Sequence, residues 1–217
     1  MRPAGAIFDL DGTLVDSMYI WDAAPKAVVR RFGGTPPDDL AARIKEMGRR
    51  EASEYMIQTF SLPCTPEQLM DGVNDLVTDE YRNRVPMKRG ADRLLERLET
   101  LGVPCGIATA SEAFQARDAM VRLGLWKYFL FAFSCQQYGP KTGPDLYLAA
   151  ARSLGSPPER TIVFEDALHA AQAARRAGFL VAGVYDPSAE GDQAALRAIC
   201  HWYLPSLDGR DFLARLG

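Results

Sequence analysis

The spacing of apolar residues divides the chain into three parts. Residues 4–10 form a short apolar run that ends at Asp and Gly, which is typical of a buried strand. From residue 16 to about residue 85, apolar positions recur at helical spacing. In that stretch, Thr65-Pro66 predicts a helix start, with Thr as the cap and Pro at the first helical position. After residue 86, helical and strand patterns alternate.

The alternating part predicts a parallel sheet with helices on both faces. We expect helices at 91–101, 111–123, 144–154 and 167–177, and strands at 103–109, 130–133, 161–164 and 179–184. The helical stretch interrupts this alternation after the first strand, so we interpret it as an inserted cap. The predicted fold class is α/β, a Rossmann-like three-layer core with a parallel sheet (residues 1–15 and 86–217) and an all-helical cap (residues 16–85).

Composition and charge exclude several classes of partner. Hydrophobic residues make up 47% of the 217 residues, and the net charge is −3. The chain therefore has the apolar content of a globular protein, and no broad basic surface for nucleic acid or an anionic membrane. No apolar run approaches the ~20 residues that span a membrane. Asp9 and Asp11 interrupt the first run, and the four cysteines lack metal-like spacing, so we expect a cytoplasmic protein without a signal peptide.

Polar residues follow several of the predicted strands. In open parallel sheets the carboxyl ends of the strands meet at one edge, where ligands bind. We therefore expect residues that are far apart in the sequence to lie close together at this edge. They are Asp9 and Asp11 at the end of the first strand, Thr109 and Ser111 at the end of the second, Lys141 in a loop, and Glu165 and Asp166 after a later strand.

The carboxylates predict a metal site. Asp9 and Asp11 are two residues apart in an extended segment and point the same way, and close carboxylates repel each other unless a positive charge lies near them. Glu165 and Asp166 complete a set of oxygen ligands without thiols, which suits Mg²⁺. The ammonium of Lys141 and the hydroxyls of Thr109 and Ser111 are suited to hold phosphate oxygens.

Four motifs resemble those of the haloacid dehalogenase superfamily of phosphatases. The segment 9–17, with Asp9-Leu10-Asp11-Gly12-Thr13 at its start, is similar to the first motif. The later motifs follow in order at Ile107-Ala108-Thr109-Ala110-Ser111, at Lys141, and at Val163-Phe164-Glu165-Asp166. The helical insert after the first motif resembles the subgroup that includes beta-phosphoglucomutase and phosphoglycolate phosphatase.

This resemblance implies a role for each residue. Asp9 would attack phosphorus and form an aspartyl phosphate, and Asp11 would act first as general acid and then as general base. Thr109 and Lys141 would bind the transferring phosphoryl group. Mg²⁺ would be held by the carboxylates of Asp9 and Asp166 and the backbone carbonyl of Asp11, with Glu165 acting mostly through water or through bonds to the ligands.

Several residues have two interpretations. Glu165 is either part of the metal site or a hydrogen-bonding brace, and Ser111 either binds phosphate or caps the next helix. In the cap, Lys45 and Arg49 lie on one helical face that either contacts the substrate or is merely solvated. Trp21 either lines the cleft between cap and core or packs there. Trp21 also occupies the position of a His in beta-phosphoglucomutase, which weakens a mutase interpretation.

We therefore predict a magnesium-dependent phosphatase for small phosphorylated metabolites of the sugar phosphate or phosphoglycolate type. One alternative is a phosphomutase of the beta-phosphoglucomutase type. The other is a non-enzymatic phospho-acceptor or binding module, because receiver domains also cluster acidic residues around Mg²⁺. We expect a monomer or a weak homodimer that binds neither nucleic acid nor membranes.

Overall fold

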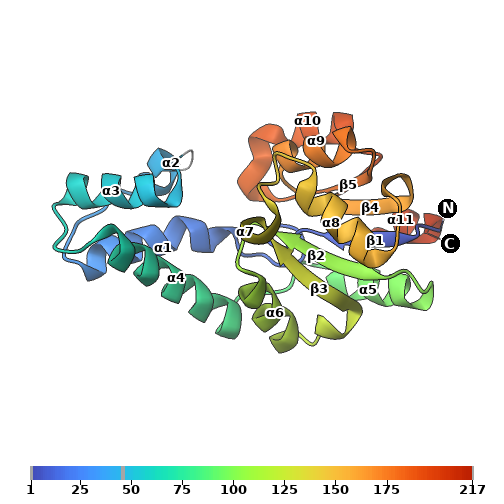
Figure 1. The fold of residues 1–217 in the computed structure, drawn as a ribbon, viewed down its shortest axis with the longest axis horizontal. Helices are drawn as coiled ribbons and strands as arrows, with labels where there is room; N and C mark the ends of the chain where they lie inside the picture. Colours follow the sequence, from blue (N-terminus) through green and yellow to red (C-terminus); the bar gives the residue numbers. More distant parts are fainter. Residues whose placement is uncertain (1, 45–46, 217) are drawn as a thin grey trace. The chain divides into compact units, whose positions relative to one another are not determined.

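The computed structural model describes residues 2–44 and 47–216 (Figure 1). The chain forms two compact units, Met1–Asp16 with Val85–Gly217, and Ser17–Arg84. The first unit contains a six-stranded sheet, and the second contains only helices among its described residues. None of the helices in the described part of the chain is long and apolar enough to cross a membrane.

The first unit is built on a parallel sheet in the order β3-β2-β1-β4-β5-β6. The strands are β1 (Gly5–Phe8), β2 (Cys105–Thr109), β3 (Phe129–Ser134), β4 (Thr161–Glu165), β5 (Leu180–Val184) and β6 (Trp202–Leu204). In the register of the sheet, Phe8 at the end of β1 lies beside Ile107 of β2 and Phe164 of β4. The carboxyl ends of these three strands therefore meet at the centre of one edge.

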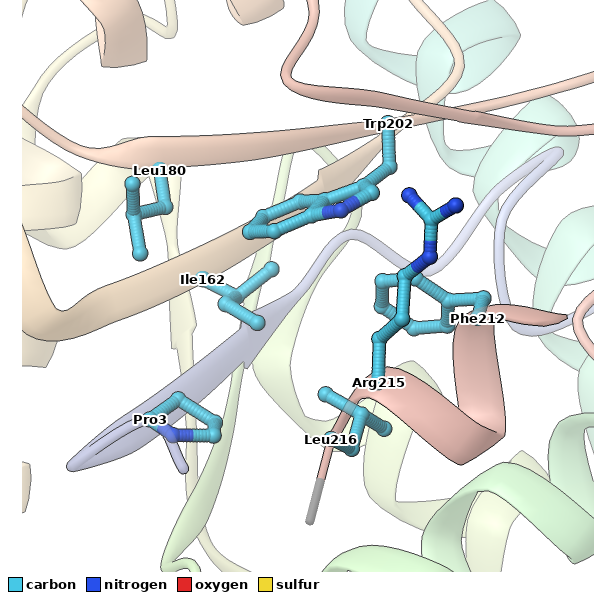
Figure 2. Close-up of a pocket in the computed structure, with 7 residues that line it drawn as sticks. All are labelled: Pro3, Ile162, Leu180, Trp202, Phe212, Arg215 and Leu216. Atoms are coloured by element: carbon cyan, nitrogen blue, oxygen red, sulfur yellow. The ribbon is translucent and has the colours of Figure 1, made fainter. Parts of the chain in front are cut away.

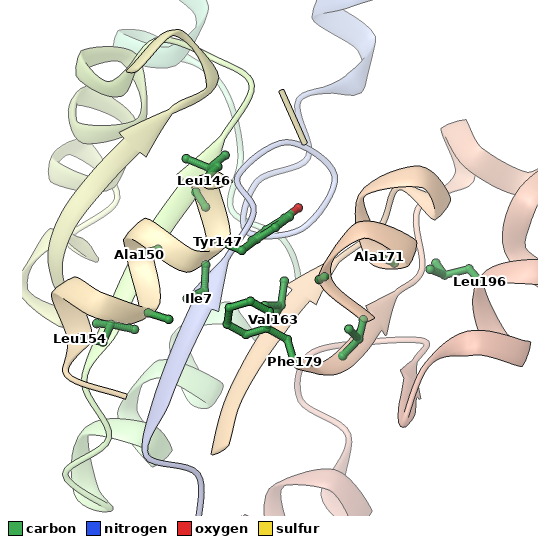
Figure 3. Close-up of a cluster of buried hydrophobic side chains, with 13 residues drawn as sticks. Ile7, Leu146, Tyr147, Ala150, Leu154, Val163, Ala171, Phe179 and Leu196 are labelled. Carbon is green, nitrogen blue, oxygen red and sulfur yellow. The ribbon is translucent and has the colours of Figure 1, made fainter. Parts of the chain in front are cut away.

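Helices pack on both faces of this sheet, which confirms the predicted α/β core. They are α5 (Ala91–Thr100), α6 (Ala113–Arg122), α7 (Cys135–Tyr138), α8 (Asp145–Leu154), α9 (Leu168–Arg176), α10 (Gln193–Ile199) and α11 (Arg210–Arg215), with short 3₁₀ turns at Trp126–Tyr128, Pro158–Arg160 and Pro187–Asp192. Successive strand residues face opposite sides. Ile7 of β1 and Val163 of β4 pack under α8 and α9 (Figure 3). Phe8 and Phe164 stack on the other face, where Phe164 also contacts Phe212 of α11.

The last third of this unit contains elements that the apolar pattern does not predict. The strand β6 has only three residues, two of them half-buried, and it lies at the edge of the sheet. Beside it is a small pocket lined by Pro3, Ile162, Leu180, Trp202, Phe212, Arg215 and Leu216 (Figure 2). Its volume of about 10 Å³ holds at most a water molecule, so it is not a substrate site.

The second unit consists of α1 (Met18–Arg31), α2 (Leu40–Ile44), α3 (Arg49–Phe60) and α4 (Pro66–Asn83). Its apolar cluster includes Val28, Leu40 and Leu69. The predicted start of α4 is confirmed, because the hydroxyl of Thr65 accepts a hydrogen bond from the backbone N–H of Gln68 and the Gln68 side chain accepts one from the backbone N–H of Thr65.

The two segments of the first unit that lead to the helical unit lie side by side. Val15 and Met87 form an antiparallel bridge. The backbone N–H of Asp16 donates to the carbonyl of Pro86 at 3.0 Å, and that of Lys88 donates to the carbonyl of Leu14 at 2.9 Å. The chain therefore leaves the sheet and returns to it at neighbouring points.

Candidate active site

The site begins where β1 ends. Asp9 is the first residue after the strand, is only 4% exposed, and donates its backbone N–H to the carbonyl of Phe164 in β4. The chain then turns tightly, because the carbonyl of Leu10 accepts hydrogen bonds from the N–H groups of Leu14 and Val15. This turn places the loop 9–15 over the ends of the central strands.

Gly12 allows the loop to approach Asp166, which follows β4. Its φ of +80° lies in the left-handed region, where residues with a Cβ are strained. A Cβ at this position would lie 2.4 Å from Oδ2 of Asp166. The neighbouring Thr13 hydroxyl donates to Oδ1 of the same carboxylate at 3.2 Å. The loop after β1 therefore packs closely against the residue that follows β4, and a hydrogen bond joins the two.

Lys141 connects two of the predicted carboxylates. The residue is 7% exposed, and its ammonium donates to Asp9 Oδ1 and to Glu165 Oε1. The hydroxyl of Tyr147 in α8 donates to the same Glu165 oxygen at 2.7 Å. Glu165 is fully buried, so these bonds to its carboxylate support its interpretation as a brace that holds Lys141.

The electrostatics follow from burial of several carboxylates around one ammonium. Burial raises the pKa of Asp9 to about 6, against the lowering effect of Lys141 and with a further rise from Glu165. Burial, followed by the charges of Asp9 and Glu165, also raises the pKa of Asp166 well above its ordinary value. Burial by itself lowers the pKa of Lys141, but the two carboxylates that it contacts raise it overall. Three buried carboxyl groups therefore share one ammonium, so a further cation would favour their ionised forms.

This arrangement fits a hard divalent cation. Asp9, Glu165 and Asp166 each offer a carboxylate oxygen, and these three atoms lie within 4.8 Å of one another. All three side chains are buried and all three donors are oxygen, which suits Mg²⁺. The Asp11 carboxylate is not among the carboxylates of this group in the described part of the chain. Metal binding through the Asp11 backbone carbonyl stays a prediction.

Thr109 and Ser111 lie at the end of β2. Thr109 is fully buried, and its hydroxyl oxygen accepts the backbone N–H of Ser111 at 2.9 Å. The hydroxyl of Ser111 donates to Oδ2 of Asp11 at 2.7 Å. The interpretation of Ser111 as a helix cap is wrong, because α6 begins at Ala113 and its N-cap is Glu112.

Comparison with known proteins assigns the family. The sequence pattern described as Haloacid dehalogenase-like hydrolase matches residues 6–184, which is most of the chain. The chain belongs to the haloacid dehalogenase-like hydrolase family. The resemblance predicted from the four motifs is therefore confirmed.

Known relatives of this hydrolase are named as phosphatases. It is 27% identical over 173 residues to a phosphorylated carbohydrates phosphatase of Thermotoga maritima, covering 79% of this chain and 80% of the relative. It is 30% identical to hexitol phosphatase A of Escherichia coli, covering 87% and 86%. A crystal structure of a putative beta-phosphoglucomutase from Thermotoga maritima has a TM-score of 0.82 and 26% identity, covering 100% of this chain and 98% of that one. The family assignment and the names of these relatives confirm the prediction that the protein is an enzyme, a hydrolase of this family.

Two residues near the carboxylates of this hydrolase were not selected from the sequence. Tyr147 lies on the buried face of α8, so its spacing indicates an ordinary core residue. Asp186 follows β5 by two residues and is buried, so the strand-end pattern that selected the other carboxylates also applies to it. Burial by itself raises the pKa of Asp186, but hydrogen bonds from Lys88 and Ser188 lower it below its ordinary value.

The predicted cap residues lie in the helical unit. Trp21 is half-buried in α1, and Arg49 is the exposed first residue of α3. Lys45 lies outside the described residues. Contact of these residues with substrate stays a prediction.

Proposed function

We propose that this hydrolase is a magnesium-dependent phosphatase that acts on small phosphorylated metabolites, with sugar phosphates as the preferred class. The observation that carries the proposal is the buried contact between Asp9 and the ammonium of Lys141, inside a group of three carboxylates. Asp11, two residues further on, supplies a further carboxyl group at the same edge. A carboxylate nucleophile, a proton donor and a cation are the groups that phosphoryl transfer to an aspartate requires.

In the first step, a carboxylate oxygen of Asp9 attacks phosphorus and the bond from phosphorus to the sugar oxygen breaks. The carboxyl group of Asp11 gives its proton to that oxygen, so the product leaves as an alcohol rather than as an alkoxide. Asp9 then carries the phosphoryl group as an aspartyl phosphate, and Asp11 is ionised.

In the second step, the Asp11 carboxylate takes a proton from a water molecule as the water oxygen attacks phosphorus. The bond between phosphorus and Asp9 breaks, which releases phosphate and regenerates the ionised Asp9 and the protonated Asp11. The two steps consume one water molecule, and each proton that Asp11 gives is returned to it.

The substrate phosphoryl group is dianionic, so attack by a carboxylate requires positive charge nearby. Lys141 supplies one charge, and its bonds to Asp9 and Glu165 fix its ammonium. Thr109 accepts a backbone N–H through its oxygen, so its hydroxyl hydrogen is suited to donate to a phosphate oxygen. Asp9, Asp166 and the Asp11 carbonyl would hold Mg²⁺, with Glu165 acting through water or through bonds to these ligands, and the ion would supply further positive charge to the phosphate oxygens.

The names of the relatives support a sugar phosphate or polyol phosphate as the substrate, because one is a phosphatase of phosphorylated carbohydrates and another a hexitol phosphatase. We propose that Arg49, Lys45 and Trp21 of the helical unit bind the part of the substrate that does not react. We also propose that the protein is cytoplasmic. We propose that it is a monomer or a weak homodimer, and sedimentation of the purified protein tests this oligomeric state.

The test is phosphate release from hexose phosphates, hexitol phosphates and phosphoglycolate, with Mg²⁺ and with EDTA. We expect release that requires Mg²⁺, and a loss of about 10³-fold or more in Asp9→Asn. Asp192→Asn is the matched control, because Asp192 is exposed and makes no side-chain capping bond. Unchanged turnover in Asp9→Asn would remove the proposed nucleophile.

The same assay separates the alternatives. Isomerisation of a sugar 1-phosphate that outruns phosphate release would identify a mutase. A chain that is slowly phosphorylated on Asp9 but never turns over would identify a phospho-acceptor module. Either outcome contradicts the proposed phosphatase.

A further inference from the structure

One side-chain contact joins the loops after two adjacent strands. The hydroxyl of Ser111, two residues after β2, donates to Oδ2 of Asp11, three residues after β1, at 2.7 Å. This short bond to a carboxylate links residues that are 100 positions apart in the sequence. This contact ties Ser111 to the loop after β1.

The serine is held firmly enough to fix its partner. Ser111 is 2% exposed, and its backbone N–H donates to the hydroxyl oxygen of Thr109. Thr109 itself is fully buried in β2. Asp11, in contrast, is half-buried on the tight loop after β1. The rigid partner is therefore the serine, and the group that it orients is the aspartate.

We infer that Ser111 is a positioning residue for the proton transfer by Asp11, rather than a phosphate ligand. This inference rests on the proposed function. The bond to Oδ2 fixes the plane of the Asp11 carboxyl group. This group is therefore already oriented toward the leaving oxygen when the proton is transferred, and its side chain need not change rotamer first. Ser111 neither gains nor loses a proton in the reaction. Thr109 and Lys141 have a different proposed role, which is to bind the transferring phosphoryl group.

The two roles of Ser111 predict different substrate dependence. A sugar alcohol is a poor leaving group and needs the proton of Asp11, whereas 4-nitrophenolate is a stable anion and leaves without one. The value of kcat/KM reports the steps up to release of the alcohol. A positioning residue therefore affects kcat/KM for a sugar phosphate far more than for 4-nitrophenyl phosphate. A phosphate ligand affects both substrates equally and also weakens inhibition by inorganic phosphate.

The experiment compares Ser111→Ala with the wild-type enzyme on both substrates. We expect kcat/KM for the best sugar phosphate to fall about 10- to 100-fold, because positioned proton transfer contributes about 10²- to 10⁴-fold. We expect the value for 4-nitrophenyl phosphate to change by less than about threefold, and the inhibition constant of inorganic phosphate to stay the same. In the Asp11→Asn background, Ser111→Ala should have no further effect on the sugar phosphate, because the group that it positions is absent.

Ser156→Ala is the matched control for loss of a buried serine hydroxyl. Ser156 is 5% exposed, and its hydroxyl lies 2.6 Å from that of Thr161, at the opposite end of β4. We expect this variant to lose stability and to keep the wild-type ratio between the two substrates. Equal losses on both substrates in Ser111→Ala, with weaker phosphate inhibition, would overturn the positioning role.

The inference and the proposed function fail in different ways. If Asp11→Asn lowers the sugar phosphate rate selectively and Ser111→Ala leaves the substrate ratio unchanged, the inference is wrong and the function stands. If the wild-type enzyme releases phosphate from neither substrate, the proposed function is wrong.

Discussion

Replacing Gly12 with alanine changes the closest approach between the loop after β1 and the end of β4. The new Cβ would lie 2.4 Å from Oδ2 of Asp166, whereas ordinary van der Waals contact begins at 3.4 Å. The backbone there has a φ of +80°, which an alanine adopts only with strain. The substitution therefore adds backbone strain and also displaces a carboxylate that is proposed to bind Mg²⁺.

The two effects have separate magnitudes. Left-handed backbone costs an alanine about 1–2 kcal/mol, partly offset by the lower entropy of the unfolded chain. Displacing Asp166 also breaks its bond from the Thr13 hydroxyl, worth about 1.5–3 kcal/mol for a charged acceptor. We expect a total loss of about 2–4 kcal/mol, which lowers the melting temperature by roughly 4–16 °C in a chain of this size. Turnover should fall by about 10²-fold, because a shift of 1 Å in a site is enough for such a loss.

Gly178→Ala is the matched control. Gly178 has a φ of +88°, and a Cβ there would meet no atom within 4 Å. This variant should show the backbone strain alone, with a melting temperature lowered by ~2–4 °C and wild-type turnover. Melting temperatures and phosphate release at 25 °C, where both variants are folded, separate the two effects. Wild-type turnover and Mg²⁺ dependence in Gly12→Ala would refute the proposed role of Asp166.

Three further predictions concern buried polar groups. Tyr147→Phe should lower the free energy of unfolding by about 1.5–3 kcal/mol in urea titrations, because Glu165 loses a hydrogen-bond donor; no change would contradict the brace. Folding lowers the pKa of Asp186, so the stability from its bond to Lys88 should be complete above about pH 4 and should be lost as the pH falls further. The free energy of unfolding, measured against pH, should therefore fall less steeply below about pH 4 in Asp186→Asn than in the wild-type protein. Burial raises the pKa of Cys105 to about 12, so peptide mass spectrometry should find it alkylated by iodoacetamide at pH 8 only after unfolding.

The sequence predicts the centre of the sheet better than the edge formed by β6. Buried parallel strands are short apolar runs, so β1 and β4 stand out, and the polar residues after them follow from the strand-end pattern. At the edge, β6 is short and half-buried and leaves no such run. A serine such as Ser111 can act as a phosphate ligand, as a helix cap or as a hydrogen-bond donor to a carboxylate. The choice depends on how the loops after β1 and β2 approach each other, which no local pattern encodes.

The antiparallel bridge between Val15 and Met87 has a consequence for how this fold tolerates change. Because Asp16 and Pro86 are hydrogen-bond neighbours, the chain ends left by removing residues 17–84 would already lie as close as those of a hairpin. A tight turn could then replace the helices without opening the sheet. Segments of different length can thus be inserted at this point, in evolution or by design, while the sheet that positions the carboxylate cluster stays unchanged.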